Sequence, residues 1–128
     1  MTRPAPKRRV LLVDDEELIR EVATVSLAKV GGWEVLTASS GEEGLGKAAA
    51  EQPDAILLDV MMPGLDGPGT LARLRADPAT AAIPVVFLTA KVRQSEQQRW
   101  VELGAAAVLV KPFDPMLLAD QVAQALGW

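Results

Sequence analysis

The chain has 128 residues, of which 49% are hydrophobic, a formal net charge of −4, and neither cysteine nor histidine. These values indicate one globular domain and exclude a disulfide framework, thiolate chemistry, a histidine metal site and a histidine phosphodonor, while the negative charge argues against a domain that mainly binds nucleic acid. No apolar run approaches the roughly 18 residues of a membrane helix, and too few apolar residues follow the basic N-terminal stretch for a signal peptide, so we expect a soluble cytoplasmic protein.

Strand and helix patterns alternate along the whole chain. Short apolar runs bounded by polar residues predict strands that are buried on both faces of a parallel sheet. Gly31 and Gly32 can adopt the left-handed backbone conformation that ends a helix, so they predict the end of the first helix. Ser40 is a suitable N-cap for the second helix. In chain order the predicted elements are strand 10–13, helix 16–30, strand 33–38, helix 40–52, strand 55–58, helix 68–76, strand 85–88, helix 94–103, strand 108–110 and a last helix with Asp114 as its N-cap.

Apolar side chains recur at helical spacing in three of these helices and indicate the faces that pack on the sheet. Strands separated by helices imply right-handed crossovers and a parallel sheet covered on both faces, which is an α/β fold of five βα units. We expect a disordered basic tail over residues 1–7 and a single domain over residues 8–128. The apolar faces are Leu18, Val22 and Val25 in the first helix, Leu71 and Leu74 in the third, and Leu118, Val122 and Ala125 in the last.

Polar side chains stand at the end of four of the predicted strands. They are Asp14 and Asp15, then Asp59, Thr89 and Lys111. Open α/β sheets bind ligands just beyond the carboxyl ends of their strands, so we expect these side chains to share one edge. Carboxylates that lie so close repel one another unless a cation joins them. The pattern therefore predicts a site for a divalent metal and a phosphoryl group.

Five short segments at the strand ends follow one another in a fixed order over residues 8 to 126. They are Leu12–Glu16, Leu57–Pro63, Asp66-Gly67, Leu88–Ala90 and Val110–Phe113. Together they resemble the response regulator receiver domain, the phospho-acceptor half of two-component signalling. The resemblance implies a flavodoxin-like, doubly wound (βα)5 sandwich, similar to that of CheY, with the parallel strand order 2-1-3-4-5.

The resemblance also implies a role for each site residue. Asp59 would be the phospho-acceptor, Lys111 would pair with a phosphoryl oxygen, and Thr89 would donate a hydrogen bond to another. Mg²⁺ would be bound directly by Asp15, Asp59 and the backbone carbonyl of Met61, and through water by Asp14. The resemblance further implies a cis peptide bond before Pro112.

Other interpretations of these residues remain open. The acids after the first strand could simply favour a helix N-terminus, and Asp59, Thr89 and Lys111 could each be ordinary turn or surface residues. The domain could be a receiver-like scaffold that is never phosphorylated. It could also be a Mg²⁺-dependent aspartyl-phosphate phosphatase, although position 61 holds Met where such enzymes have a second aspartate, or a flavodoxin-like flavin protein, which the acids after the first strand disfavour.

The resemblance also predicts partners. A sensor histidine kinase or histidine phosphotransferase would donate the phosphoryl group, and a downstream protein would bind the face of the fourth helix, fifth strand and fifth helix. The protein would be a monomer or a phosphorylation-dependent dimer. Val108 replaces the aromatic residue usual on the fifth strand, and Trp100 is either core packing or a partner contact. Met61 and Lys91 beside the site predict a long-lived phosphorylated form.

Overall fold

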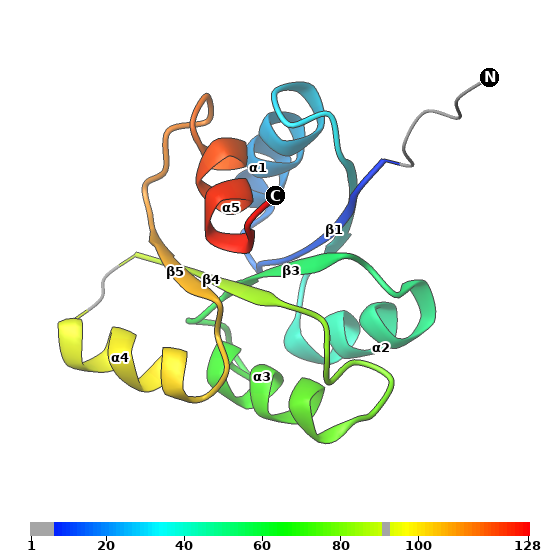
Figure 1. Ribbon diagram of the computed structural model, residues 1–128, viewed down its shortest axis with the longest axis vertical. Coiled ribbons are helices and arrows are strands. Elements are labelled where there is room, and N and C mark those ends of the chain that lie inside the picture. The colour runs from blue at the N-terminus through cyan, green and yellow to red at the C-terminus, as the bar shows by residue number, and fades with distance from the viewer. Residues whose placement is uncertain (1–6, 91–92) are drawn as a thin grey trace.

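The computed structural model describes residues 7–90 and 93–128, and the ten predicted elements are all found there (Figure 1). Residues 1–6 of the predicted tail, and Lys91, fall outside the described residues. Within the described residues, no helix is long and apolar enough to cross a bilayer. The strands are β1 (Arg9–Val13), β2 (Glu34–Ala38), β3 (Ala55–Asp59), β4 (Val85–Thr89) and β5 (Ala107–Val110). The helices are α1 (Glu17–Lys29), α2 (Gly41–Glu51), α3 (Gly67–Ala76), α4 (Gln94–Glu102) and α5 (Leu118–Leu126).

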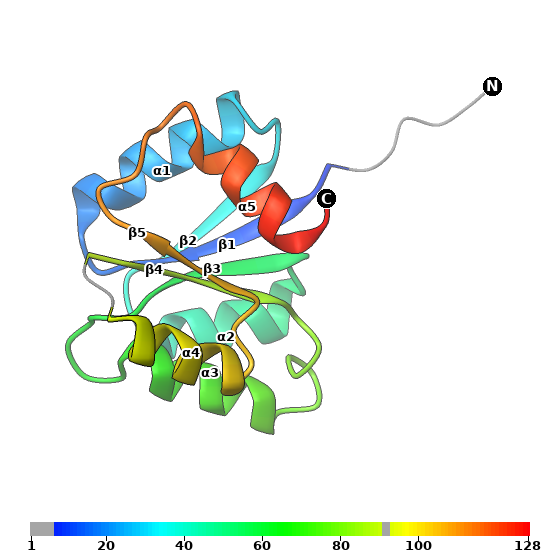
Figure 2. The same cartoon turned by 60° about the vertical axis from the view of Figure 1, so that its left-hand side comes forward.

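All five strands are parallel and lie in the order β2-β1-β3-β4-β5, as predicted. Helices α1 and α5 cover one face of the sheet, and α2, α3 and α4 cover the other (Figure 1). Because the strands are parallel, their carboxyl ends meet at one edge, which is at the left in Figure 2. The predicted α/β class and strand order are therefore confirmed.

Successive residues of the central strands face opposite sides of the sheet and fill two cores. Leu57 and Leu88 belong to the core under α1 and α5, whereas Leu58 and Phe87 belong to the core over α2, α3 and α4. The Phe87 ring meets Trp100 of α4 edge to face, with 5.6 Å between the ring centroids. Trp100 is only 9% exposed, so it packs in the core. Core packing was one of the two roles predicted for it, and a partner contact was the other.

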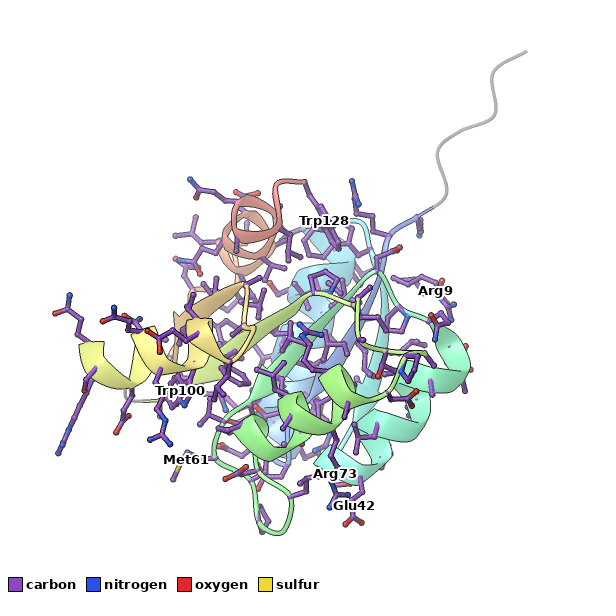
Figure 3. All side chains as sticks on the ribbon, turned by 60° about the horizontal axis from the view of Figure 1, so that its bottom comes forward. Arg9, Glu42, Met61, Arg73, Trp100 and Trp128 are labelled. Atoms are coloured by element: carbon purple, nitrogen blue, oxygen red, sulfur yellow. The ribbon has the colours of Figure 1, made fainter. Side chains whose placement is uncertain are left out.

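A second aromatic contact brings the last residue of the chain against the residue before β2. Trp33, just before β2, meets Trp128 edge to face with 5.1 Å between centroids. The guanidinium carbon of Arg8 lies 4.2 Å from the centre of the Trp128 ring, which is a cation–π distance. Figure 3 shows Trp128 beside the N-terminal strand, at the sheet edge opposite the carboxyl ends.

The predicted packing face of α1 is wrong. Leu18 and Val25 are 69% and 59% exposed, whereas Ala23, Ser26 and Leu27 are buried. Small side chains on the inner face let α1 approach α5 closely, and the Ser26 hydroxyl donates to a backbone carbonyl just before α5. The apolar residues Leu18, Val22 and Val25 therefore form an exposed stripe on α1.

The start of α5 also differs from the prediction. The helix begins at Leu118, and residues 115–117 form a turn. The Asp114 carboxylate accepts a hydrogen bond from the Met116 amide at 2.9 Å, so Asp114 caps this turn and not the helix itself. Leu118 and Val122 are buried as predicted, and Ala125 packs at the margin of the same core.

Candidate metal and phosphoryl-transfer site

The sheet edge brings three of the predicted side chains into one ionic cluster. Asp14 follows β1, Asp59 ends β3, and Lys111 follows β5. The Lys111 Nζ lies 2.7 Å from Asp14 Oδ2 and 3.4 Å from Asp59 Oδ1. All three residues are at most 9% exposed. Two aspartates and a lysine, distant in the sequence, therefore share one buried position, as predicted.

Asp14 is held through all of its polar groups. Its amide donates to the Ala38 carbonyl at 3.1 Å, and its own carbonyl accepts from Arg20 Nη1 at 2.7 Å. Its Oδ1 accepts from the Glu16 amide at 2.8 Å, and its Oδ2 accepts from Lys111. Asp14 is thus fixed in the main chain and the side chain alike.

Asp59 is held much less completely. Its Oδ1 accepts from the Met61 amide at 3.3 Å, but its buried Oδ2 has no hydrogen-bond partner among the described residues. Burial, and to a lesser extent the Asp14 carboxylate, raise the pKa of Asp59 to about 6, while Lys111 acts in the opposite direction. A buried acceptor without a partner is rare in native proteins. Asp59 Oδ2 is therefore available to a ligand.

The surrounding acids fit a divalent cation. Asp14, Asp15, Glu16 and Asp59 each offer a carboxylate oxygen, and these oxygens lie within 4.8 Å of one another. Mg²⁺ prefers such hard oxygen ligands, and the unpartnered Asp59 Oδ2 supplies one that the protein itself leaves unused. The structure thus brings Asp15 into the cluster, as predicted.

Glu16 is not among the predicted site residues, although it belongs to the cluster. Its side chain is 61% exposed, and its Oε1 lies 3.8 Å from Lys111 Nζ. The run of four acids after β1 was the available signal, because a residue that directly follows Asp14 and Asp15 lies at the same edge of the sheet.

Thr89 and Met61 lie at the same edge. Thr89 ends β4 and is 1% exposed, and its carbonyl accepts from the Lys111 amide at 2.7 Å. The Lys111–Pro112 peptide bond is cis, as the resemblance implied. The Met61 side chain is 74% exposed, and Figure 3 shows it projecting outward from the ribbon.

Gly67 fixes the position of the Asp59 main chain. A Cβ at Gly67 would lie 2.6 Å from the Asp59 carbonyl oxygen and 2.6 Å from the Val60 Cα. The Gly67 amide also donates to the Val60 carbonyl at 2.9 Å. The first residue of α3 therefore packs directly on the end of β3, which requires glycine there.

Comparisons with known proteins agree with this geometry. A family model described as "Response regulator receiver domain" matches residues 10–123. The "Probable transcriptional regulator ycf27" of Guillardia theta is 40% identical over 116 residues, which are 91% of this chain and 44% of that protein. The "Alkaline phosphatase synthesis transcriptional regulatory protein PhoP" of Bacillus subtilis is 43% identical over 108 residues, which are 84% of this chain and 44% of that protein.

Solved structures are similar as well. The chemotaxis protein CheY4 of Vibrio cholerae matches with a TM-score of 0.87 and 32% identity, covering 94% of this chain and 99% of that one. The chain spans less than half the length of ycf27 and PhoP. Those two similarities therefore concern only the part that the proteins share.

Proposed function

Because the chain belongs to the response regulator receiver domain family, we propose that Asp59 accepts a phosphoryl group and that this transfer switches the binding of a partner protein. The observation that carries the proposal is the buried Asp59 carboxylate beside three further acids, whose Oδ1 lies 3.4 Å from Lys111 and whose Oδ2 has no hydrogen-bond partner among the described residues. The domain, over residues 8–128, then catalyses only its own phosphorylation and dephosphorylation.

The donor is a phosphohistidine outside these 128 residues, which contain no histidine. It belongs to a sensor histidine kinase or a histidine phosphotransferase. One carboxylate oxygen of Asp59 attacks the phosphorus, an O–P bond forms, and the P–N bond to the imidazole breaks. The imidazole nitrogen leaves with the electron pair and is protonated. The pKa of Asp59 is raised to about 6, so at neutral pH most of the carboxylate is ionised and can attack.

Lys111 and Thr89 receive the transferred group. The Lys111 ammonium already lies between two carboxylates, and it can pair with a phosphoryl oxygen as a compact cation. The Thr89 hydroxyl donates a hydrogen bond to another phosphoryl oxygen. Asp15, Asp59 and the Met61 carbonyl would hold Mg²⁺ directly, and Asp14 through water. When bound, Mg²⁺ would offset the negative charge that collects in the transition state.

The donor protein docks on α1. An apolar groove of about 440 Å³ runs between α1 and the turn before α5, lined in part by Val22, Val25, Pro115 and Met116. It adjoins the loop that carries Lys111. This exposed apolar groove supports the docking of the donor protein, because apolar surface on a small domain commonly marks an interaction site.

The downstream protein binds the face of α4, β5 and α5. Val101 of α4 and Val110 of β5 are each 51% exposed, and Val108 lines a groove with α4 residues. Val108 cannot make the large rotation of an aromatic side chain, so the switch acts through Thr89 and α4. The protein acts in the cytoplasm, as a monomer or a phosphorylation-dependent dimer.

Acetyl phosphate with Mg²⁺ tests the proposal. Intact-mass spectrometry should detect a phosphoryl adduct on the wild type and on Asp120→Asn, an exchange at an exposed aspartate of α5. The adduct should be absent from Asp59→Asn. A wild type that binds Mg²⁺ but forms no adduct would favour the scaffold interpretation.

A further inference from the structure

Arg20 makes a contact that phosphoryl transfer does not by itself explain. This half-buried residue of α1 reaches back past the start of the helix, and its Nη1 donates to the Asp14 carbonyl at 2.7 Å. None of the ion pairs among the described residues includes Arg20. The guanidinium is therefore used on the main chain, next to the acids of the site.

The contact acts on the peptide unit that leads into Asp15. The Asp14 carbonyl and the Asp15 amide belong to one plane, so holding the carbonyl fixes the direction in which the Asp15 Cα leaves. The Asp15 carboxylate makes no hydrogen bond within the described residues and is exposed. Its position therefore depends on the main chain that carries it and on its own side-chain torsions.

We propose that Arg20 is a positioning residue, which holds the Asp14–Asp15 peptide so that the Asp15 carboxylate faces the metal site. The inference rests on the proposed function, since it assumes that Asp15 and Asp59 bind a divalent cation. It also explains why a cationic side chain stands here. By charge alone, a guanidinium near a cation site weakens cation binding, so its presence requires a compensating geometric role.

Charge and geometry predict opposite signs, and a titration separates them. Mg²⁺ affinity is measured by isothermal titration calorimetry at constant ionic strength for the wild type, Arg20→Met, Arg20→Lys and Lys29→Met. Loss of an outer-shell partner typically weakens metal binding by about 10–100-fold, so the Kd of Arg20→Met should rise about tenfold. Arg20→Lys, which keeps a donor, should lie between the two. A Kd for Arg20→Met that equals or falls below the wild-type value would overturn the inference.

Lys29→Met is the matched control. It removes the same charge from the exposed last turn of α1, far from the site, where salt screens most of its effect. Its Kd should stay within about twofold of the wild type.

A double-mutant cycle tests whether Arg20 acts through Asp15. In the Asp15→Asn background, Arg20→Met should weaken Mg²⁺ binding no further, because the carboxylate that Arg20 positions is already absent. A second loss of similar size would mean that Arg20 acts by another route, and the inference would fail.

The metal-free protein provides an independent readout. The Glu16 amide, which donates to Asp14 Oδ1, should exchange with solvent faster in Arg20→Met than in the wild type, as measured by NMR in EDTA. Unchanged exchange would contradict the inference. A wild type that binds no Mg²⁺ would refute the metal site of the proposed function together with this inference. A wild type that binds it, with an unchanged Arg20→Met, would refute the inference alone.

Discussion

Lys111 lies closer to Asp14 than to Asp59, with 2.7 Å from its Nζ to Asp14 Oδ2 and 3.4 Å to Asp59 Oδ1. Its principal partner is therefore the aspartate that is fully engaged and 0% exposed, not the proposed acceptor. Burial lowers and these carboxylates raise the pKa of Lys111, with a net increase, so the lysine stays charged. The acceptor therefore shares its lysine with Asp14, and within the described residues its Oδ2 has no hydrogen-bond partner.

Lys111→Met should destabilise the metal-free protein by about 3 kcal/mol. Removing one partner of a buried pair leaves the other as an uncompensated buried charge, and here that charge is Asp14. Urea unfolding at neutral pH measures the change. Lys47→Met removes a partly exposed pair with Glu43 and a hydrogen bond to the Thr37 carbonyl, and should cost only about 1 kcal/mol. Equal effects of the two substitutions would contradict the account of Lys111.

Asp59→Asn should stabilise the metal-free protein near pH 7.5 by about 2 kcal/mol. The pKa of Asp59 is raised from 3.8 to about 6, so the folded state binds this proton more tightly than the unfolded state does. The stability from that proton is complete below about pH 4 and is lost as the pH rises through about 6. The variant avoids this loss, and its advantage should vanish near pH 4. Urea unfolding across this range measures the difference, and a constant difference would argue against the raised pKa.

Gly67→Ala should slow phosphorylation and destabilise the protein by about 1–3 kcal/mol, because the new Cβ would overlap the Asp59 peptide and displace it. Adduct formation with acetyl phosphate and urea unfolding are the measurements. Gly46→Ala is the matched control, since nothing lies within 4 Å of a Cβ there. Alanine inside α2 should add about 0.5–1 kcal/mol of stability and leave phosphorylation unchanged. An unaffected Gly67→Ala would show that the α3 contact does not position the acceptor.

Met61→Asn should shorten the lifetime of the phosphorylated form several-fold. In the proposed phosphorylated form the apolar Met61 side chain, two residues after the acceptor, would restrict the approach of water, whereas an amide would hydrogen-bond to it. The adduct is followed by intact mass after acetyl phosphate is removed. Met116→Asn makes the same exchange at another exposed methionine and should leave the lifetime unchanged. Rapid loss of the adduct in the wild type would contradict the predicted long lifetime.

The strands were predictable because burial on both faces leaves a direct trace in the sequence. Runs such as Val85–Leu88 have no polar position, and each of the five strands was found. The packing face of α1 was predicted wrongly because periodicity shows that a helix has an apolar face, but not whether that face packs on the sheet. The inner face depends on Ser26, whose hydrogen-bond partner lies 89 residues away in the sequence.

The residues of the site also divide into those that the sequence predicts and those that it does not. Asp14, Asp59 and Lys111 were predictable because parallel strands end at one edge. Glu16 and Arg20 were not predicted, because their roles depend on how α1 leaves that edge. A surface arginine on a helix and one that donates to the Asp14 carbonyl look alike in the sequence. Only the path of the main chain between β1 and α1 distinguishes them.

The edge-to-face contact of Phe87 with Trp100 gives the protein an optical probe of its own. Phe87 lies two positions before Thr89 on β4, and Trp100 lies in α4. Any rearrangement of the β4 end relative to α4 changes the surroundings of that indole and hence its emission. Trp33 and Trp128 lie against each other at the opposite edge of the sheet, where they contribute a steady background. The state of the switch can therefore be followed in real time by intrinsic fluorescence, without a label.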